Sequence, residues 1–471
     1  MTVVGRERAQ KAALVAIITS LFVLLRCARA FSDQNSEEQR LSVLAQSGKY
    51  DQLIAAATEL LQRNPGDVIA LFYRGQAYGA LGEWQAALAD DNAALRIEPN
   101  SVGALVNRGA ARGRLGDFDG AIEDENAALA INPNVAKAYV NRGWARGNLG
   151  DWKGEVEDIS VALNISSNDA VAYVDRGVAR GKLGDFAGEI DDESTAIAID
   201  PQNVDAYVNL GRAIGKRGDW NRAITDENKA LAIDPKSADA YVDRGLARGK
   251  LGDWQGEVQD ETAALAIDAK VTTAYVDRGW ARGHLGDWNG VVDDESAALA
   301  NDPKNADAYM NRAWAKDSLG DFVGAVNDAK AAVAADPSNA LGQASLGEAL
   351  YLLGNYQDAI DDETKSLQAE PNLAFARQIR GAAYYRLGEY AGAVTDETAV
   401  LQTDWREAFA LRIRGAAYAK MGLLQESIAD ESVSLWVAPP NAFAYEVLDG
   451  DADTAAPSLA GVPPPTRSLA P

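Results

Sequence analysis

The sequence of 471 residues has almost no cysteine or histidine, because it contains one of each, Cys27 and His284. A chain with one cysteine forms no internal disulfide, and one with a single histidine has no plausible His-based triad and no zinc site of the usual ligands. Hydrophobic residues make up 47% and charged residues 24%, a composition typical of a folded protein. The composition therefore excludes several enzyme classes without suggesting disorder.

Residues 1–30 have the pattern of a secretory signal peptide. Basic residues precede an apolar run over residues 12–25, and Ala28 and Ala30 offer a small-residue cleavage site. An uncleaved anchor is the alternative, but that run is short of the roughly 20 residues that a membrane span needs. We expect cleavage after Ala30, which leaves a secreted or periplasmic chain without cysteine and without stable membrane insertion.

Positive charge is scarce, with 45 Lys and Arg against 69 Asp and Glu and a net charge of -24. Residues 1–30 hold five of the basic residues and one of the acidic ones, so the mature chain is more acidic still. Affinity for nucleic acid and anionic membranes comes largely from cations that neutralise phosphates. We therefore expect no nucleic-acid partner.

An aromatic residue recurs every 34 residues without an insertion, and Leu424 closes the series. Each unit reads as one helix up to a Leu-Gly break and a second helix from the aromatic to a proline such as Pro235. Ser167, Ala269 and Trp405 replace that proline, which predicts tighter or more helical joints there. The aromatic positions are Tyr50, Trp84, Phe118, Trp152, Phe186, Trp220, Trp254, Trp288, Phe322, Tyr356 and Tyr390.

This pattern resembles the tetratricopeptide repeat. In one unit the small, aromatic and proline positions of that family are Gly211, Trp220, Ala223, Ala230 and Pro235. The resemblance covers residues 34–441, which are twelve units. It implies an all-α, right-handed superhelical solenoid of antiparallel helix pairs, whose first helices line a concave groove.

Beyond the repeats, residues 442–449 begin a further first helix and stop. We expect them to form a capping helix over the last exposed apolar face. Residues 450–471 have few large apolar residues and much proline, which predicts a disordered tail.

Arginine occupies a position of the first helices where the family commonly has leucine. Arg244 and Arg248 share a helix face with Ala240 and Ala247, the spacing of a buried stripe. Leu210 interrupts the series, as does Leu346. The equivalents of Arg244 are Arg74, Arg108, Arg142, Arg176, Arg278, Arg312, Arg380 and Arg414.

Carboxylates on the second helices match these arginines. Glu257 and Glu261 fall on the inward stripe, and an aspartate equivalent to Asp260 recurs in every unit from the second to the twelfth. Because burial of either charge alone is costly, the pattern predicts a ladder of ion pairs that fixes the register of the helices. The alternative is that the arginines face the groove and bind an anionic partner. Gly245 and Gly249 indicate a close approach by a neighbouring helix or a partner's backbone.

The resemblance places the partner-binding groove on the other face of the first helices. The residue before the first arginine is commonly an asparagine that holds a peptide backbone in superhelical members of the family, although three of seven are aspartate here. Large aromatic side chains, Trp144, Trp280 and Trp314, follow three residues later, where the opening unit has Leu246. Packing between helices is the alternative role of the tryptophans. The seven positions before the arginine are Asn107, Asn141, Asp175, Asn209, Asp243, Asp277 and Asn311.

We therefore expect a non-enzymatic scaffold without cofactors that binds a basic or amphipathic protein segment, since the groove is acidic and has aromatic anchors. The alternative is a self-associating structural or cell-surface solenoid. His284 is expected to be a solvated surface residue.

Overall fold

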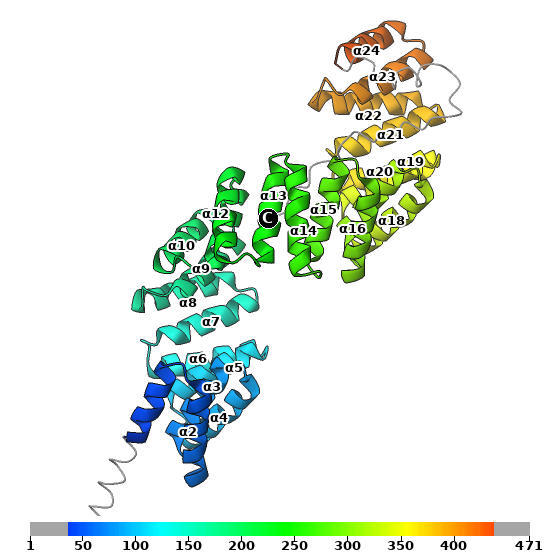
Figure 1. The fold of residues 1–471 in the computed structure, drawn as a ribbon. Coiled ribbons are helices and arrows are strands. Elements are labelled where there is room, and N and C mark those ends of the chain that lie inside the picture. The colour runs from blue at the N-terminus through cyan, green and yellow to red at the C-terminus, as the bar shows by residue number, and fades with distance from the viewer. Residues whose placement is uncertain (1–35, 438–471) are drawn as a thin grey trace, which may run out of the picture. The chain divides into compact units, whose positions relative to one another are not determined.

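The computed structural model describes residues 36–437, and these residues are helical with short connections and no strand (Figure 1). They belong to two compact units, Met1–Ala213 and Ile214–Pro471, whose boundary falls within one helix. Within residues 36–437, no helix is both long and apolar enough to cross a membrane. The predicted signal peptide, capping helix and tail lie outside the described residues and stay predictions.

In the first unit, residues 36–46 are helical and pair with α2, and each later repeat is an odd-numbered first helix followed by an even-numbered second helix. The helices are α2 (Tyr50–Arg63), α3 (Val68–Ala80), α4 (Trp84–Ile97), α5 (Val102–Arg114), α6 (Phe118–Ile131), α7 (Ala136–Asn148), α8 (Trp152–Ile165), α9 (Ala170–Lys182), α10 (Phe186–Ile199) and α11 (Val204–Lys216), which contains the boundary.

The second unit continues the same alternation. Its helices are α12 (Trp220–Ile233), α13 (Ala238–Lys250), α14 (Trp254–Ile267), α15 (Thr272–His284), α16 (Trp288–Asn301), α17 (Ala306–Ser318), α18 (Phe322–Ala335), α19 (Ala340–Leu352), α20 (Tyr356–Ala369), α21 (Ala374–Leu387), α22 (Tyr390–Thr403), α23 (Ala408–Lys420) and α24 (Leu424–Val437).

The turn inside each repeat contains a glycine, and in seven repeats an aspartate then caps the second helix. Gly252 has a φ of 82°, in the left-handed region that ends helices, and the N–H of Asp253 reaches back to the carbonyl of Arg248 at 2.9 Å. The Asp253 carboxylate then accepts from the N–H of Gly256 at 2.9 Å and caps α14. Glycines with positive φ recur every 34 residues from Gly48 to Gly422, so the described repeats share this turn.

The connections between repeats do not depend on proline. Four residues join α12 to α13, where Pro235 is present, and four also join the helices around Ser167, Ala269 and Trp405. The expectation of tighter or more helical joints was wrong, because an extended residue such as Ser166 ends the helix equally well.

Within each unit, consecutive helices pack side by side, and first helices also contact the first helices of adjacent repeats (Figure 1). Among the contacts described within residues 36–437, none joins two second helices, so the first helices lie on the inner side of each unit. Alanines such as Ala240, Ala247 and Ala264 form the buried core at 0–1% exposure. The all-α solenoid class is confirmed, and its small core residues bring the helices close together.

Candidate interaction surface

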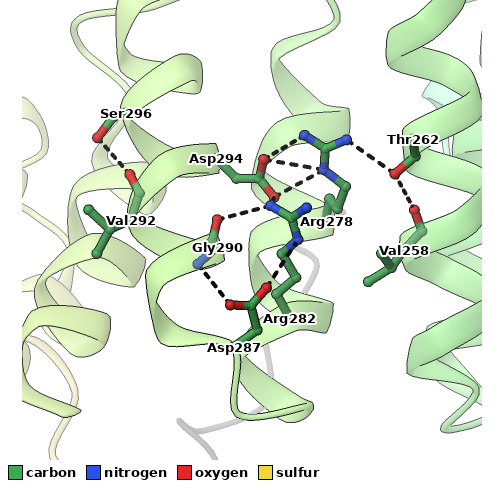
Figure 2. A network of polar contacts seen from close by, with 9 residues as sticks. All are labelled: Val258, Thr262, Arg278, Arg282, Asp287, Gly290, Val292, Asp294 and Ser296. Carbon is green, nitrogen blue, oxygen red and sulfur yellow. Dashed lines mark hydrogen bonds and ion pairs between the residues drawn. The ribbon is translucent and has the colours of Figure 1, made fainter. Parts of the chain in front are cut away.

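On five first helices, α5, α7, α9, α13 and α15, two arginines share one aspartate of the following second helix. Figure 2 shows Arg278 and Arg282 of α15 both directed at Asp294 of α16. Arg278 holds both carboxylate oxygens, with Nη2 at 2.6 Å from Oδ1 and Nε at 3.0 Å from Oδ2. Arg282 Nη1 donates to Oδ2 at 2.8 Å and to the Gly290 carbonyl at 3.2 Å. A two-pronged guanidinium suits this arrangement, since it matches the spacing of the carboxylate oxygens.

The first arginine also connects its repeat to the preceding one. Nη1 of Arg278 donates to the Thr262 hydroxyl on α14 at 3.1 Å, and that hydroxyl donates in turn to the Val258 carbonyl (Figure 2). The arginine therefore bridges residues 16 positions before and after it in the chain. The other acceptors at the position of Thr262 are Thr58, Asn92, Asn126, Ser160, Asn228, Ser296, Thr364 and Thr398.

The predicted ladder of ion pairs is present, and the arginines use their nitrogens within the chain. In the opening repeat, Arg244 Nε and Nη2 bind Asp260 while Nη1 binds Asn228. The arginine side chain is 15% exposed and the aspartate 4%. Because the fork is occupied, these contacts disfavour the alternative in which the arginines bind an anionic partner.

Two repeats lack the first arginine and provide a cation by another route. Leu346 stands at the arginine position of α19, and Asp362 of the same repeat instead binds Lys365, one turn along its own helix, at 2.5 Å. Leu210 is the other exception, and Asp226 of that repeat binds Lys229 at 2.7 Å. Lysine occurs at this position in no other repeat of the sequence. The chain therefore pairs the buried aspartate in every repeat from the second to the twelfth.

The glutamates do not take part in the ladder, so the expectation that Glu257 and Glu261 pair with the arginines was wrong. Glu261 is 0% exposed, neither carboxylate oxygen has a hydrogen-bond partner, and burial raises its pKa to about 10. Its carboxyl group fills the space that Gly245 leaves by lacking a side chain. Glu257 fills the space at Gly249 in the same way. The two glycines thus accommodate side chains of the chain itself, rather than a neighbouring backbone.

Three of the predicted peptide-binding asparagines donate hydrogen bonds to such glutamates. Asn141, Asn209 and Asn311 each donate from Nδ2 to the glutamate 16 residues earlier, at 2.7, 3.2 and 2.8 Å. The hydrogen bond from Asn141 opposes the effect of burial, which raises the pKa of Glu125 to about 8. The side-chain amide that was predicted to bind a peptide backbone therefore already donates a hydrogen bond within the chain.

The other predicted positions of this row differ from one another. Asn107 Nδ2 is buried without a partner. Burial and the charge of Asp169 raise the pKa of Asp175 to about 6. Asp243 and Asp277 are half-buried, and both lie close enough to Glu261 to raise its pKa. The structure therefore brings the row together with the buried carboxyl groups, and its binding to a partner stays a prediction.

Trp144 and Trp314 are partly buried because their rings lie against a glycine of the preceding repeat, Gly113 and Gly283. Trp314 also meets the Trp288 ring edge to face at 4.7 Å. These contacts support the packing role, although both rings stay partly exposed. Leu246 is likewise half-buried.

Trp280 has a different environment, which includes His284. The histidine ring stacks on Trp254 at 3.9 Å and meets Trp280 at 5.0 Å. Burial lowers the pKa of His284, so the expectation of a solvated residue was wrong. His284 lies four residues after Trp280 on α15, about one helical turn, and so reaches both Trp280 and Trp254, the aromatic residue that begins α14.

The 34-residue spacing is shared by sequence models of a known family. A model described as TPR repeat matches residues 213–252, and models described as Tetratricopeptide repeat match residues 40–102 and 312–374, and residues 194–225. The chain is a tetratricopeptide repeat protein. Such arrays serve in general as protein–protein interaction scaffolds and are typically non-catalytic. No group of three or more His, Cys, Asp or Glu residues within residues 36–437 is arranged to hold a metal ion.

Solved structures that resemble this tetratricopeptide repeat protein share little of its sequence. The APC/C hetero-tetramer Cut9-Hcn1 is 15% identical with a TM-score of 0.49, over 87% of this chain and 96% of that chain. MamA protein is 26% identical with a TM-score of 0.34, over 36% and 94%. YrrB, described as a TPR protein with an unusual peptide-binding site, is 16% identical with a TM-score of 0.34, over 39% and 95%.

Proposed function

We propose that this protein is a non-enzymatic scaffold that binds a basic or amphipathic segment of another protein along the inner face of its first helices. The observation that carries the proposal is the row of half-exposed acidic and aromatic side chains on these helices, including Asp243, Asp277 and Trp280. Internal packing buries only part of each side chain. Acidic charge attracts a basic segment, while aromatic rings provide contact area at small entropic cost.

A photo-crosslinking amino acid tests the face. We place p-benzoylphenylalanine at Leu246, on the inner face of α13, and at the exposed Asp293 of α16 as the matched control. The proposal expects discrete crosslinked products from the inner position in extracts of the source cells, identified by mass spectrometry. Products from the control position alone would contradict it.

Self-association is the second candidate, and exposed apolar side chains along α24 favour it. Leu424, Ile428, Leu435 and Trp436 are 53–68% exposed there, whereas Leu401 and Leu367, equivalents of Leu435, are 9% exposed in internal repeats. An exposed apolar face of this kind marks a contact site. Sedimentation velocity across a hundredfold range of concentration separates the candidates, since a polymer grows with concentration and the scaffold stays monomeric.

A further inference from the structure

One part of the inner face in the second unit combines aromatic rings with carboxyl groups. Trp314 and Asp317 lie one turn apart on α17, and Trp288 of α16 packs against the Trp314 ring. Glu348 extends from α19, which contacts α17, and its charge acts on Asp317. We call these four residues, Trp288, Trp314, Asp317 and Glu348, the aromatic–acidic surface. All four are partly exposed.

The carboxyl groups of this surface have no cation beside them to balance their charge. Asp317 Oδ1 is buried and has no hydrogen-bond partner, and the charges that raise the pKa of Asp317 to about 9, after burial itself, are those of Glu348 and Asp321. Burial raises the pKa of Glu348 to about 7. Lys316 lies next to Asp317 in the chain but binds Asp328 at 2.7 Å. Both carboxyl groups therefore hold their protons to a higher pH than usual, and no described residue beside them supplies the cation that would favour their ionised forms.

Elsewhere in the array, the chain places its own arginine at the corresponding point. In the first unit, Arg114 at the end of α5 lies over the Trp144 ring at 4.6 Å. Near the other end, Arg386 of α21 donates a hydrogen bond to Tyr351. The equivalents of Arg114 on α15 and α17 are His284 and Ser318, which provide no guanidinium. Arg114 thus shows, within the chain itself, a planar cation against the tryptophan that is equivalent to Trp314.

We propose that the aromatic–acidic surface binds an arginine side chain of the partner protein. This inference rests on the proposed function and names the chemistry of its partner. A guanidinium stacks on tryptophan and donates to two carboxylates at once, whereas lysine offers a point charge without a stacking plane. An incoming cation also favours the ionised carboxylates, whose pKa values it lowers. The acidic chain attracts such a segment from a distance.

A pair of labelled peptides tests the inference on the full chain. The first is a fluorescent dodecapeptide with four arginines among alanine and glutamine, and the second carries citrulline, the neutral analogue, at the same places. Fluorescence anisotropy at low salt is expected to show binding of the arginine peptide at least about 10-fold tighter. Glu348→Gln and Trp314→Ala are each expected to weaken this binding by about 10-fold.

Two further variants separate a site from general charge attraction. Asp293→Asn removes one negative charge from an exposed position on α16 and is expected to change affinity by less than about 2-fold. His284→Arg places a guanidinium relative to Trp314 as Arg114 stands relative to Trp144, and is expected to compete with the peptide. Far-UV circular dichroism checks folding, and Trp314→Phe, expected to bind more tightly than Trp314→Ala, replaces it if the alanine variant unfolds.

Equal weakening by Glu348→Gln and Asp293→Asn would overturn the inference, because binding would then follow net charge alone. Equal affinity of the citrulline peptide would do the same. Neither result touches the proposed function, which fails only if the crosslinker at Leu246 captures no partner. Crosslinks from Leu246 without an arginine-dependent site would leave the scaffold and remove this ligand.

Discussion

At the scale of single residues, an arginine that recurs in most repeats joins its own repeat to the preceding one. Arg244 binds Asp260 on one side and Asn228 on the other. The repeats that lack the arginine show how its loss is tolerated, since Lys365 takes over where Leu346 stands. Lys330 stands 16 residues before Leu346, at the position of the polar acceptor, where no arginine is present to donate a hydrogen bond. The repeats therefore act as controls for one another.

The first prediction concerns a variant that copies the Leu346 and Lys365 arrangement into the repeat of Arg244. Arg244→Leu is expected to lower the free energy of unfolding by about 2–3 kcal/mol, because it leaves the buried Asp260 with Arg248 alone. Adding Ala263→Lys, which reproduces the position of Lys365, is expected to recover about half of the loss. Urea unfolding followed by circular dichroism measures both. A loss within about 0.5 kcal/mol for Arg244→Leu would mean that the pair is solvated and contributes little.

The acceptor position shows what sequence reasoning missed at this scale. Asparagine, serine or threonine recurs at the place of Thr262, with the same spacing of 34 residues as the arginines. The 34-residue spacing of these polar residues can be read from the sequence, but small polar residues are common on the exposed faces of helices and do not indicate a partner. Only the packed geometry shows that an arginine reaches back 16 residues to meet them.

At the scale of helices, a glycine on one element is matched to a carboxyl group on its neighbour. Gly245 faces Glu261, and a Cβ at this position would collide with the carboxyl group. One repeat has neither residue, since Ala313 and Ala329 stand at these places, 1% and 0% exposed. Another repeat keeps the glycine, Gly143, and places Ile159 opposite it, so the glycine accommodates whichever large side chain faces it.

That exchange gives the second prediction. Gly245→Ala is expected to destabilise the protein by about 1–3 kcal/mol through overpacking, although alanine favours a helix by about 1 kcal/mol. The double variant Gly245→Ala with Glu261→Ala is expected to recover most of the loss. Gly79→Ala is the matched control, since its nearest contact would be an ordinary 3.4 Å from Trp84, and should be neutral or stabilising. Equal losses at Gly79 and Gly245 would point to the helix backbone instead of the carboxyl group.

The helices themselves were predictable, whereas their polar interior was only partly so. The period, the Leu-Gly break and the N-cap aspartates determine where helices begin and end, and the structure has helices at these places. The choice between Asp260 and Glu261 as arginine partner was not predictable, because adjacent residues on a helix differ by only about 100° and both face inward. For the same reason, the asparagine row that was predicted to face a peptide also meets the glutamates beneath it.

At the scale of the whole molecule, the pKa of Asp328 and those of the buried glutamates are shifted in opposite directions. Burial alone would raise the pKa of Asp328, but hydrogen bonds from Arg312 and Lys316 outweigh it and hold the pKa below its usual value. Buried glutamates have the opposite shift, because burial dominates. Asp328 and these glutamates therefore have opposite effects on stability as the pH changes.

The third prediction is a stability profile with a maximum in mildly acidic solution. A depressed pKa, as at Asp328, gives stability that is present above the unfolded value and lost as the pH falls through the folded pKa. A raised pKa, about 9 for Glu193 and about 10 for Glu261, gives stability that is complete below the unfolded value of about 4.3. That stability is lost progressively as the pH rises to the folded pKa. The free energy of unfolding is therefore expected to fall between about pH 5 and pH 9.

Glutamine at position 261 isolates one of these groups. Glu261→Gln is expected to match the natural chain near pH 5 and to exceed its stability near pH 9, because glutamine has no proton to lose and a similar shape. The slope with pH is expected to be shallower by up to about 1 kcal/mol per pH unit. Glu157→Gln, whose glutamate side chain is 65% exposed, is the control and should leave the slope unchanged. Parallel profiles for the natural chain and Glu261→Gln would show that the buried glutamate is ionised in the folded protein, and a cation would then have to lie beside it.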